Sequence, residues 1–142
     1  MTVKEYLTRL SVLKRKADHK KQELRCVKRA GMGCRPRTGT GKVQTSFRPA
    51  GCPTERYAVR IAALEDSVNK SLLSYLEERD SMVNQIHELD NGSYIDILHK
   101  RYVEEIRNFE SIAEDMGYSY QYVLNKHSKA LKAFENKFPE LF

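Results

Sequence analysis

The sequence predicts an all-α protein, in which a long antiparallel helical hairpin, coiled-coil-like, precedes a C-terminal three-helix domain. Apolar residues recur three and four positions apart along residues 1–30, 54–89 and 94–138, which is the period of amphipathic helices. Five of the seven glycines and three of the four prolines fall in residues 31–54, so a break separates the first two helices. We therefore expect two domains, residues 1–90 and residues 91–142.

Composition restricts the class of protein. At 142 residues the chain has room for one or two small domains. No apolar run approaches the roughly 18 residues of a membrane span, and the N-terminus has no apolar signal core, so we expect a cytoplasmic protein without membrane contact. The three cysteines, Cys26, Cys34 and Cys52, are odd in number and lack C-x2-C spacing. That spacing favours free thiols over a disulfide framework or a zinc site.

Charge is distributed unevenly along the chain. Residues 1–54 hold 14 Lys and Arg against 3 Asp and Glu, residues 55–93 hold 4 against 8, and residues 94–142 hold 7 against 8. The basic excess is therefore N-terminal. In the last segment Lys126, Lys129, Lys132 and Lys137 face only Glu135 along the final helix.

The first predicted helix covers residues 1–30. Thr2 and Glu5 have the spacing of a capping box at its start. Its apolar stripe fails at Lys20 and Lys21, so it is not a continuous coiled-coil seam. Two interpretations of its basic residues stay open, a solvated helix face or a stripe that contacts phosphates. These residues are Lys14, Arg15, Lys16, Lys20, Lys21, Arg25, Lys28 and Arg29.

The segment 31–54 is predicted to be a flexible basic loop, because prolines remove backbone donors and glycines cost entropy in regular structure. The run Gly39 to Lys42 lacks the full G-x4-G-K-[ST] spacing of a nucleotide-binding loop. Ordering of this loop on nucleic acid is a minority interpretation.

The second predicted helix covers residues 54–89, and its apolar stripe needs a partner. Folding back on the first helix gives a hairpin, whose register the opposite charges of the two helices would favour. The alternative is that stripes from two chains pair, and with so little else to bury them we expect a homodimer. Asp90 to Ser93 is predicted to end this helix, with Asn91 and Gly92 in left-handed backbone and Ser93 capping the next helix.

The C-terminal domain is predicted to contain helices from Tyr94 to Val103, from Phe109 and from Ser119. Ile95, Leu98 and Tyr102 are expected to face inward from the first of these. Acidic pairs at 104–105 and 114–115 are expected on helix surfaces that point away from DNA.

The pattern that ties the last two helices together is Ala113-x3-Gly117-x5-Val123, the spacing of a helix-turn-helix. Ala113 leaves space for the crossing helix, and Gly117 supplies the left-handed backbone that ends the first. Tyr118 is expected to pack. Ser119 can accept a hydrogen bond from a first-turn N–H of the next helix.

The last helix divides into two faces. Val123, His127, Ala130, Leu131 and Phe134 are expected inward, with His127 a satisfied core histidine rather than a catalytic base. The outward side chains suit DNA, because Gln and Asn can pair with adenine edges, Tyr can reach phosphate or a thymine methyl, and Lys neutralises phosphate. The candidate DNA-binding residues are Ser119, Tyr120, Gln121, Tyr122, Asn125, Lys126 and Lys129. The alternative is an ordinary polar surface on a packing helix.

Four segments together resemble the promoter-reading C-terminal domain, region 4, of bacterial sigma factors. They are Tyr102-Val103, the run Phe109 to Ser119, Val123 and Lys129-Ala130-Leu131. The similarity is closer to the sigma-like regulators of phages and prophages, of the ArpU and RinA kind. The opening MTVKEYL resembles a phage family of unknown function. The specific part covers residues 94–138, and the chain departs from a complete sigma factor in lacking an aromatic-rich promoter-melting segment and any Trp.

The resemblance implies a phage transcription regulator, which binds double-stranded DNA, activates late or packaging genes and contacts RNA polymerase of the bacterial host near its nucleoid. No cofactor, metal or enzymatic step is expected. Two alternatives stay open, a DNA-packaging oligomer resembling a terminase small subunit, and a sigma mimic that binds polymerase without reading sequence.

Overall fold

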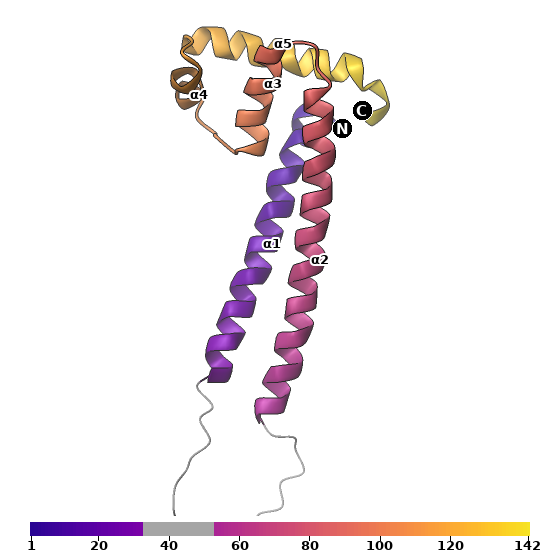
Figure 1. Cartoon of the computed structure of the whole chain (residues 1–142), viewed down its shortest axis with the longest axis vertical. Helices are drawn as coiled ribbons and strands as arrows, with labels where there is room; N and C mark the ends of the chain where they lie inside the picture. Colours follow the sequence, from indigo (N-terminus) through magenta and orange to yellow (C-terminus); the bar gives the residue numbers. More distant parts are fainter. Residues whose placement is uncertain (33–52) are drawn as a thin grey trace, which may run out of the picture. The chain divides into compact units, whose positions relative to one another are not determined.

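The structure, a computed structural model, describes residues 1–32 and 53–142, and every regular element in these ranges is a helix (Figure 1). The expected all-α class is therefore confirmed. The α-helices are α1 (Val3–Met32), α2 (Pro53–His87), α3 (Gly92–Leu98), α4 (Phe109–Met116) and α5 (Tyr120–Lys137). A π-helical turn, η1 (His99–Val103), follows α3, and a 3-10 turn, η2 (Pro139–Leu141), follows α5.

Contacts along the chain define two compact units. Unit 1 comprises residues 1–15 and 73–142, and unit 2 comprises residues 16–72. The expected domain boundary after residue 90 falls inside unit 1, and separate folding of the two expected domains stays a prediction. Most of the expected basic loop, residues 33–52, lies outside the described residues. The regular helices at its ends extend slightly further than expected, to Met32 and from Pro53.

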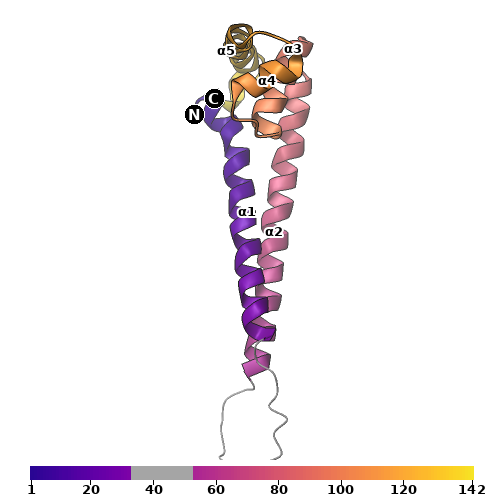
Figure 2. The same ribbon diagram turned by 90° about the vertical axis from the view of Figure 1, so that its left-hand side faces the viewer.

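In unit 2, the second half of α1 runs beside the first half of α2 in the opposite direction (Figures 1 and 2). Ala17, Val27 and Val68 are buried there. Lys28 pairs with Glu65 at 2.7 Å, and Lys20 Nζ donates to Ser71 Oγ at 2.7 Å. Two basic side chains of α1, Lys20 and Lys28, therefore bond to residues of α2. Arg25 and Arg29 are exposed to solvent.

In unit 1, the main core joins the start of α1, the end of α2, α3, η1 and α5. The expected capping box is present, since Thr2 N donates to Glu5 Oε2 at 2.7 Å and Glu5 N donates to Thr2 Oγ1 at 3.3 Å. Hydrogen bonds to the Glu5 carboxylate from the backbone N–H and from the side chain of Thr2 lower the pKa of that carboxyl. The buried members of this core are Val3, Tyr6, Leu7, Leu10, Met82, Ile86, Leu89, Leu98, Val103, Ala130, Leu131 and Phe134.

An aromatic cluster around Phe134 holds the C-terminal end of α5 in this core. The Phe134 ring is fully buried, with the Phe138 ring 5.0 Å away between centroids and the Phe142 ring 6.1 Å away. Tyr6 stacks edge-on against Phe142 at 5.7 Å, and its hydroxyl donates to Gln85 Oε1 at 2.8 Å. Residues distant in sequence thus form one packed layer, which the local periodicity of either segment does not reveal.

The connection between α2 and α3 differs from the expected turn. Asn91 has extended backbone, with φ −112° and ψ 113°, and its side chain accepts a hydrogen bond from Ser93 N at 3.0 Å. Asn91 is therefore the N-cap of α3, not a left-handed residue, and Ser93 lies inside the first turn. An Asn side chain competes well for this position because its oxygen replaces the missing partner of a first-turn N–H.

The predicted helix from Tyr94 to Val103 begins earlier, at Gly92, and does not stay α-helical. It changes at His99 into a π turn, in which Glu104 N donates to His99 O at 3.0 Å. The chain then reverses through Glu105, which has φ 59° and is the only non-glycine residue of the described ranges with positive φ. Glu104 and Glu105 therefore occupy a turn, which corrects the expected helix surface at this pair.

None of the helices in the described ranges is apolar enough over a sufficient length to cross a bilayer.

Candidate nucleic-acid interface

The end of α4 is fixed by a left-handed glycine. Gly117 has φ 68° and ψ 29°, a conformation that strains residues with a Cβ. Tyr118 N donates to Ala113 O at 2.9 Å, and Gly117 N donates to Glu114 O at 3.2 Å. This pair of bonds is a Schellman motif, which satisfies the last carbonyls of the helix. The conformation predicted for Gly117 is confirmed.

The start of α5 is fixed by Ser119. Its backbone is extended, and its hydroxyl oxygen accepts a hydrogen bond from Tyr122 N at 3.3 Å, as an N-cap requires. The predicted cap is confirmed. Only three residues, 117 to 119, separate α4 from α5. The conformation of this short link is therefore set at both ends, by the left-handed Gly117 and by the N-cap Ser119.

The predicted inward face of α5 is confirmed residue by residue. Val123, His127, Ala130, Leu131 and Phe134 are all buried. At the α4 end Val123 packs in a second core with Ile97, Ile112 and Ala113. On α3 and η1, Ile95, Leu98 and Tyr102 were expected to face inward. Leu98 is buried, whereas Ile95 and Tyr102 are half-buried. Ile97, which was not in the expected set, is fully buried.

Burial of one face leaves the other open to solvent. Gln121 and Asn125, four residues apart, share one side of α5, and both are exposed. No described residue hydrogen-bonds either side-chain amide. Among the seven candidate residues, Ser119, Tyr120, Gln121, Tyr122, Asn125 and Lys129 are exposed, and Lys126 is half-buried.

Lys126 is held by aromatic rings rather than by an acid. Its Nζ lies 5.2 Å from the centroid of the Tyr122 ring and 5.6 Å from that of Tyr94. Such cation–π contacts restrain the ammonium group without neutralising it. The structure thus brings Lys126 together with Tyr122 and with Tyr94 of α3. Lys129 is exposed and takes no part in this group.

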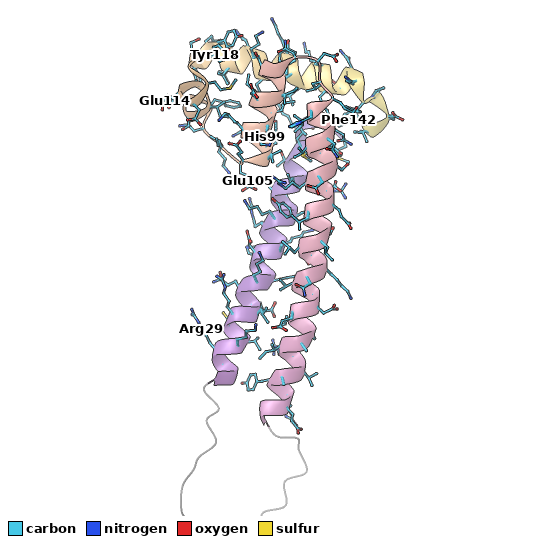
Figure 3. All side chains as sticks on the ribbon, in the orientation of Figure 1. Arg29, His99, Glu105, Glu114, Tyr118 and Phe142 are labelled. Atoms are coloured by element: carbon cyan, nitrogen blue, oxygen red, sulfur yellow. The ribbon has the colours of Figure 1, made fainter. Side chains whose placement is uncertain are left out.

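Tyr118 was expected to pack, and it does so on the surface rather than in the core. It is 44% exposed, and its ring lies 4.7 Å from that of Tyr122. Because Gly117 turns the chain outward, the next side chain is directed across the start of α5 instead of into the core. Tyr118, labelled in Figure 3, therefore joins the exposed tyrosines Tyr120 and Tyr122. The repeated tyrosines at 118, 120 and 122 were the sequence signal for this group.

Acidic residues surround the exposed end of α4. Glu114 is exposed, and Asp115 forms an ion pair with Lys100, with 3.5 Å between Oδ2 and Nζ. At the other end of α5, Lys137 pairs with Asp90 at 3.3 Å and also donates to the backbone oxygen of Glu88. The cations of α5 are therefore not equivalent, because Lys137 already contacts one carboxylate and one backbone carbonyl of its own unit.

His127 has the properties of a core residue. Its ring is buried, lies 5.0 Å from the Phe109 ring and shares a hydrogen bond with the Tyr102 hydroxyl. Burial, with further contributions from the charges of Lys4 and Arg101, lowers the pKa of His127 from 6.5 to about 4. The ring is therefore neutral at physiological pH, and burial also raises the pKa of the Tyr102 hydroxyl.

Metal-binding geometry is not found in the described part of the chain, where no three His, Cys, Asp or Glu side chains gather around a common point. Cys26 is an exposed free thiol. Cys34, Cys52 and the Gly39–Lys42 run lie outside the described residues.

Comparison of the chain with family models, with curated proteins and with solved structures found no match.

Proposed function

We propose that this protein binds double-stranded DNA and regulates transcription, with α4 and α5 forming a helix-turn-helix whose second helix enters the major groove. The observation that carries this proposal is the division of α5 into two faces. Its apolar side is buried, while Gln121 and Asn125 on the other side have no described hydrogen-bond partner. Side-chain amides held free on a rigid helix are suited to base edges, and those four residues apart can reach neighbouring base pairs.

The geometry of the connection supports the same proposal. A left-handed Gly117 followed by a capping Ser119 gives a short, defined link, which a recognition helix needs in order to be held at a fixed angle. Exposed tyrosine hydroxyls and Lys129 at this end of α5 could contact phosphates and set the position of the helix on the duplex.

Self-association would supply the second half-site that helix-turn-helix regulators commonly use. On α2, Leu73 is 59% exposed and Leu76 is 40% exposed, three residues apart on one helix. Together with Val12 on α1, at 43%, they provide apolar surface that pairing of two chains through the predicted hairpin would cover. We therefore include a homodimer in the proposal.

In keeping with the resemblance to sigma region 4, the proposed role is activation of phage genes beside the host RNA polymerase, in the cytoplasm and at the nucleoid. Binding of this kind needs no catalytic group and no cofactor.

The test is selection of bound sequences from a random duplex pool, at a salt concentration of about 0.15 M that suppresses binding through phosphates alone. The proposal predicts an enriched motif, with two spaced halves if the protein is a dimer. Lack of enrichment would contradict base reading by α5. A stable ring of many copies would instead indicate a packaging subunit, and polymerase binding without a motif would indicate a sigma mimic.

A further inference from the structure

A small cavity in unit 1 gathers three arginine side chains from different parts of the chain. Its volume is about 190 Å³. Arg15 comes from α1, Arg101 from η1, and Arg107 from the connection that leads to α4. The remaining lining residues are Leu7, Thr8, Ser11, Tyr102 and Glu105.

The positive charge in this cavity is not neutralised from within it. The one acid in the lining, Glu105, is engaged by Lys14 at 2.9 Å. No described residue forms an ion pair or hydrogen bond with the guanidinium group of Arg15 or Arg107. Cationic groups that converge on a recess concentrate the electrostatic field there and attract an anion.

Arg101 is already fixed in position. Its Nη1 donates to the backbone oxygen of Ile106 at 3.2 Å and to that of Arg107, and its guanidinium lies 4.6 Å from the centre of the Phe109 ring. These contacts leave Nε and Nη2 without a described partner. An immobilised guanidinium loses little further freedom when it binds, and its planar donors match a phosphate better than a lysine does.

The hydroxyls in the lining are less available as donors. Thr8 Oγ1 donates to Lys4 O at 2.6 Å, and Ser11 Oγ donates to Thr8 O at 2.8 Å. The arginines must therefore carry recognition of any ligand. The surrounding backbone is unusual as well, because the cavity borders the π turn and the left-handed Glu105, conformations that are enriched at functional sites.

We infer that this cavity binds a phosphate group. Its volume lies below the roughly 300–1,000 Å³ of pockets that enclose an organic ligand, so a single phosphate fits inside while any larger remainder stays in solvent. The site is distinct from the proposed DNA-reading face, since neither Gln121 nor Asn125 lines the cavity. In Figure 3, Glu105 of the cavity is also separate from Tyr118, which precedes α5. The phosphate could be inorganic, or it could belong to the backbone of a nucleic acid.

The experiment is a titration of the full chain with inorganic phosphate, followed by calorimetry and by the shifts of backbone amide resonances. We expect saturable binding, with the largest shifts at residues 101–107. Arg15→Ala and Arg107→Ala should each weaken binding about tenfold or more, the loss of one charge-assisted contact. Both side chains are exposed and without described bonds, so the variants should keep the melting temperature of the parent protein.

Arg29→Ala is the matched control, because Arg29 is an exposed arginine that lies in unit 2 and does not line the cavity. It should leave phosphate affinity unchanged. Absence of saturable binding, or equal weakening by Arg29→Ala and Arg107→Ala, would overturn the proposal.

The source of the phosphate is found by adding a duplex of arbitrary sequence to the phosphate-loaded protein. Displacement of phosphate, with weaker duplex binding by Arg107→Ala, supports a backbone phosphate as the ligand. Retention of phosphate supports a free anion. Neither result depends on Gln121 or Asn125, so failure of the selection experiment would leave this site untouched.

Discussion

The Tyr102 hydroxyl and His127 Nε2 lie 3.2 Å apart and share a hydrogen bond, which joins the π turn η1 to the buried face of α5. Their rings also stack, with centroids 5.9 Å apart and planes inclined by 25°. A neutral imidazole can take part in this junction, whereas a protonated one would place a charge among apolar groups near Lys4 and Arg101.

This junction predicts a loss of stability in mild acid. The folded pKa of His127 is lowered from 6.5 to about 4, so between these values the unfolded chain binds a proton that the folded chain does not. Stability should therefore be complete above about pH 6.5, fall as the pH drops toward about 4, and lose no more from this group below that. Allowing for some solvent access, the loss is roughly 1–3 kcal/mol.

The measurement is urea unfolding at about pH 7 and about pH 4.5, with His127→Gln as the comparison. Glutamine can still bond the Tyr102 hydroxyl but does not titrate. The variant should lose less stability between the two pH values, and an identical loss in both proteins would show that other groups cause the acid sensitivity.

Gly117→Ala should destabilise the protein by about 1–2 kcal/mol, because the Cβ opposes a φ of 68°. No atom lies within 4 Å of the position that the new Cβ would take, so the cost is conformational rather than steric. Gly92→Ala is the matched control, since its site is equally open and has no positive φ. Equal melting temperatures of the two variants would contradict the role assigned to Gly117.

Gln121→Ala and Asn125→Ala should each reduce affinity for the selected DNA site by about 1–3 kcal/mol and relax sequence preference at one position. Asn136→Ala removes an exposed amide from the far end of the same helix and should have no effect. Comparison of Kd values on the selected site and on single-base variants makes the measurement. If Asn136→Ala were as damaging as Asn125→Ala, base reading would not be the cause.

Lys129→Ala should weaken binding to all duplexes alike. It should also reduce the steepness of the slope of log K against log salt by about 0.9, the contribution of one phosphate contact. We choose Lys129 because Lys126 also contacts two tyrosine rings, so its loss would alter more than charge. The slope of log K against log salt is the measurement. Gln121→Ala should leave that slope unchanged, and a parallel decrease in both variants would contradict this division of roles.

The α4–α5 region was the most predictable part of the chain, because its structure is determined locally. Gly117 and Ser119 each act on backbone groups within five residues, and the 3.6-residue period assigned every buried side chain of α5. The cap at Thr2 was equally accessible from sequence. Whether the exposed residues contact DNA is a different question, since exposure follows from periodicity and recognition does not.

Features of the turns on either side of α3 and η1 were missed, because residue type alone does not determine them. In the π turn at His99–Val103, a backbone N–H bonds to the carbonyl five residues earlier rather than four, as in an α-helix. No residue type in that run indicates this change. The position of Arg101 over Phe109 depends on the turn that follows. Asn91 was placed in the right segment but in the wrong conformation, because Asn favours both left-handed turns and N-caps.

The fixed phase of α5, which starts three residues after α4 and buries one face, has a consequence for how sequences of this kind can diverge. One residue inserted into the first turns of α5 would rotate the preceding side chains by about 100° relative to the buried face, and would carry Gln121 away from its side of the helix. Relatives of this chain should therefore vary in length elsewhere and show neither insertions nor deletions between Ala113 and Phe134.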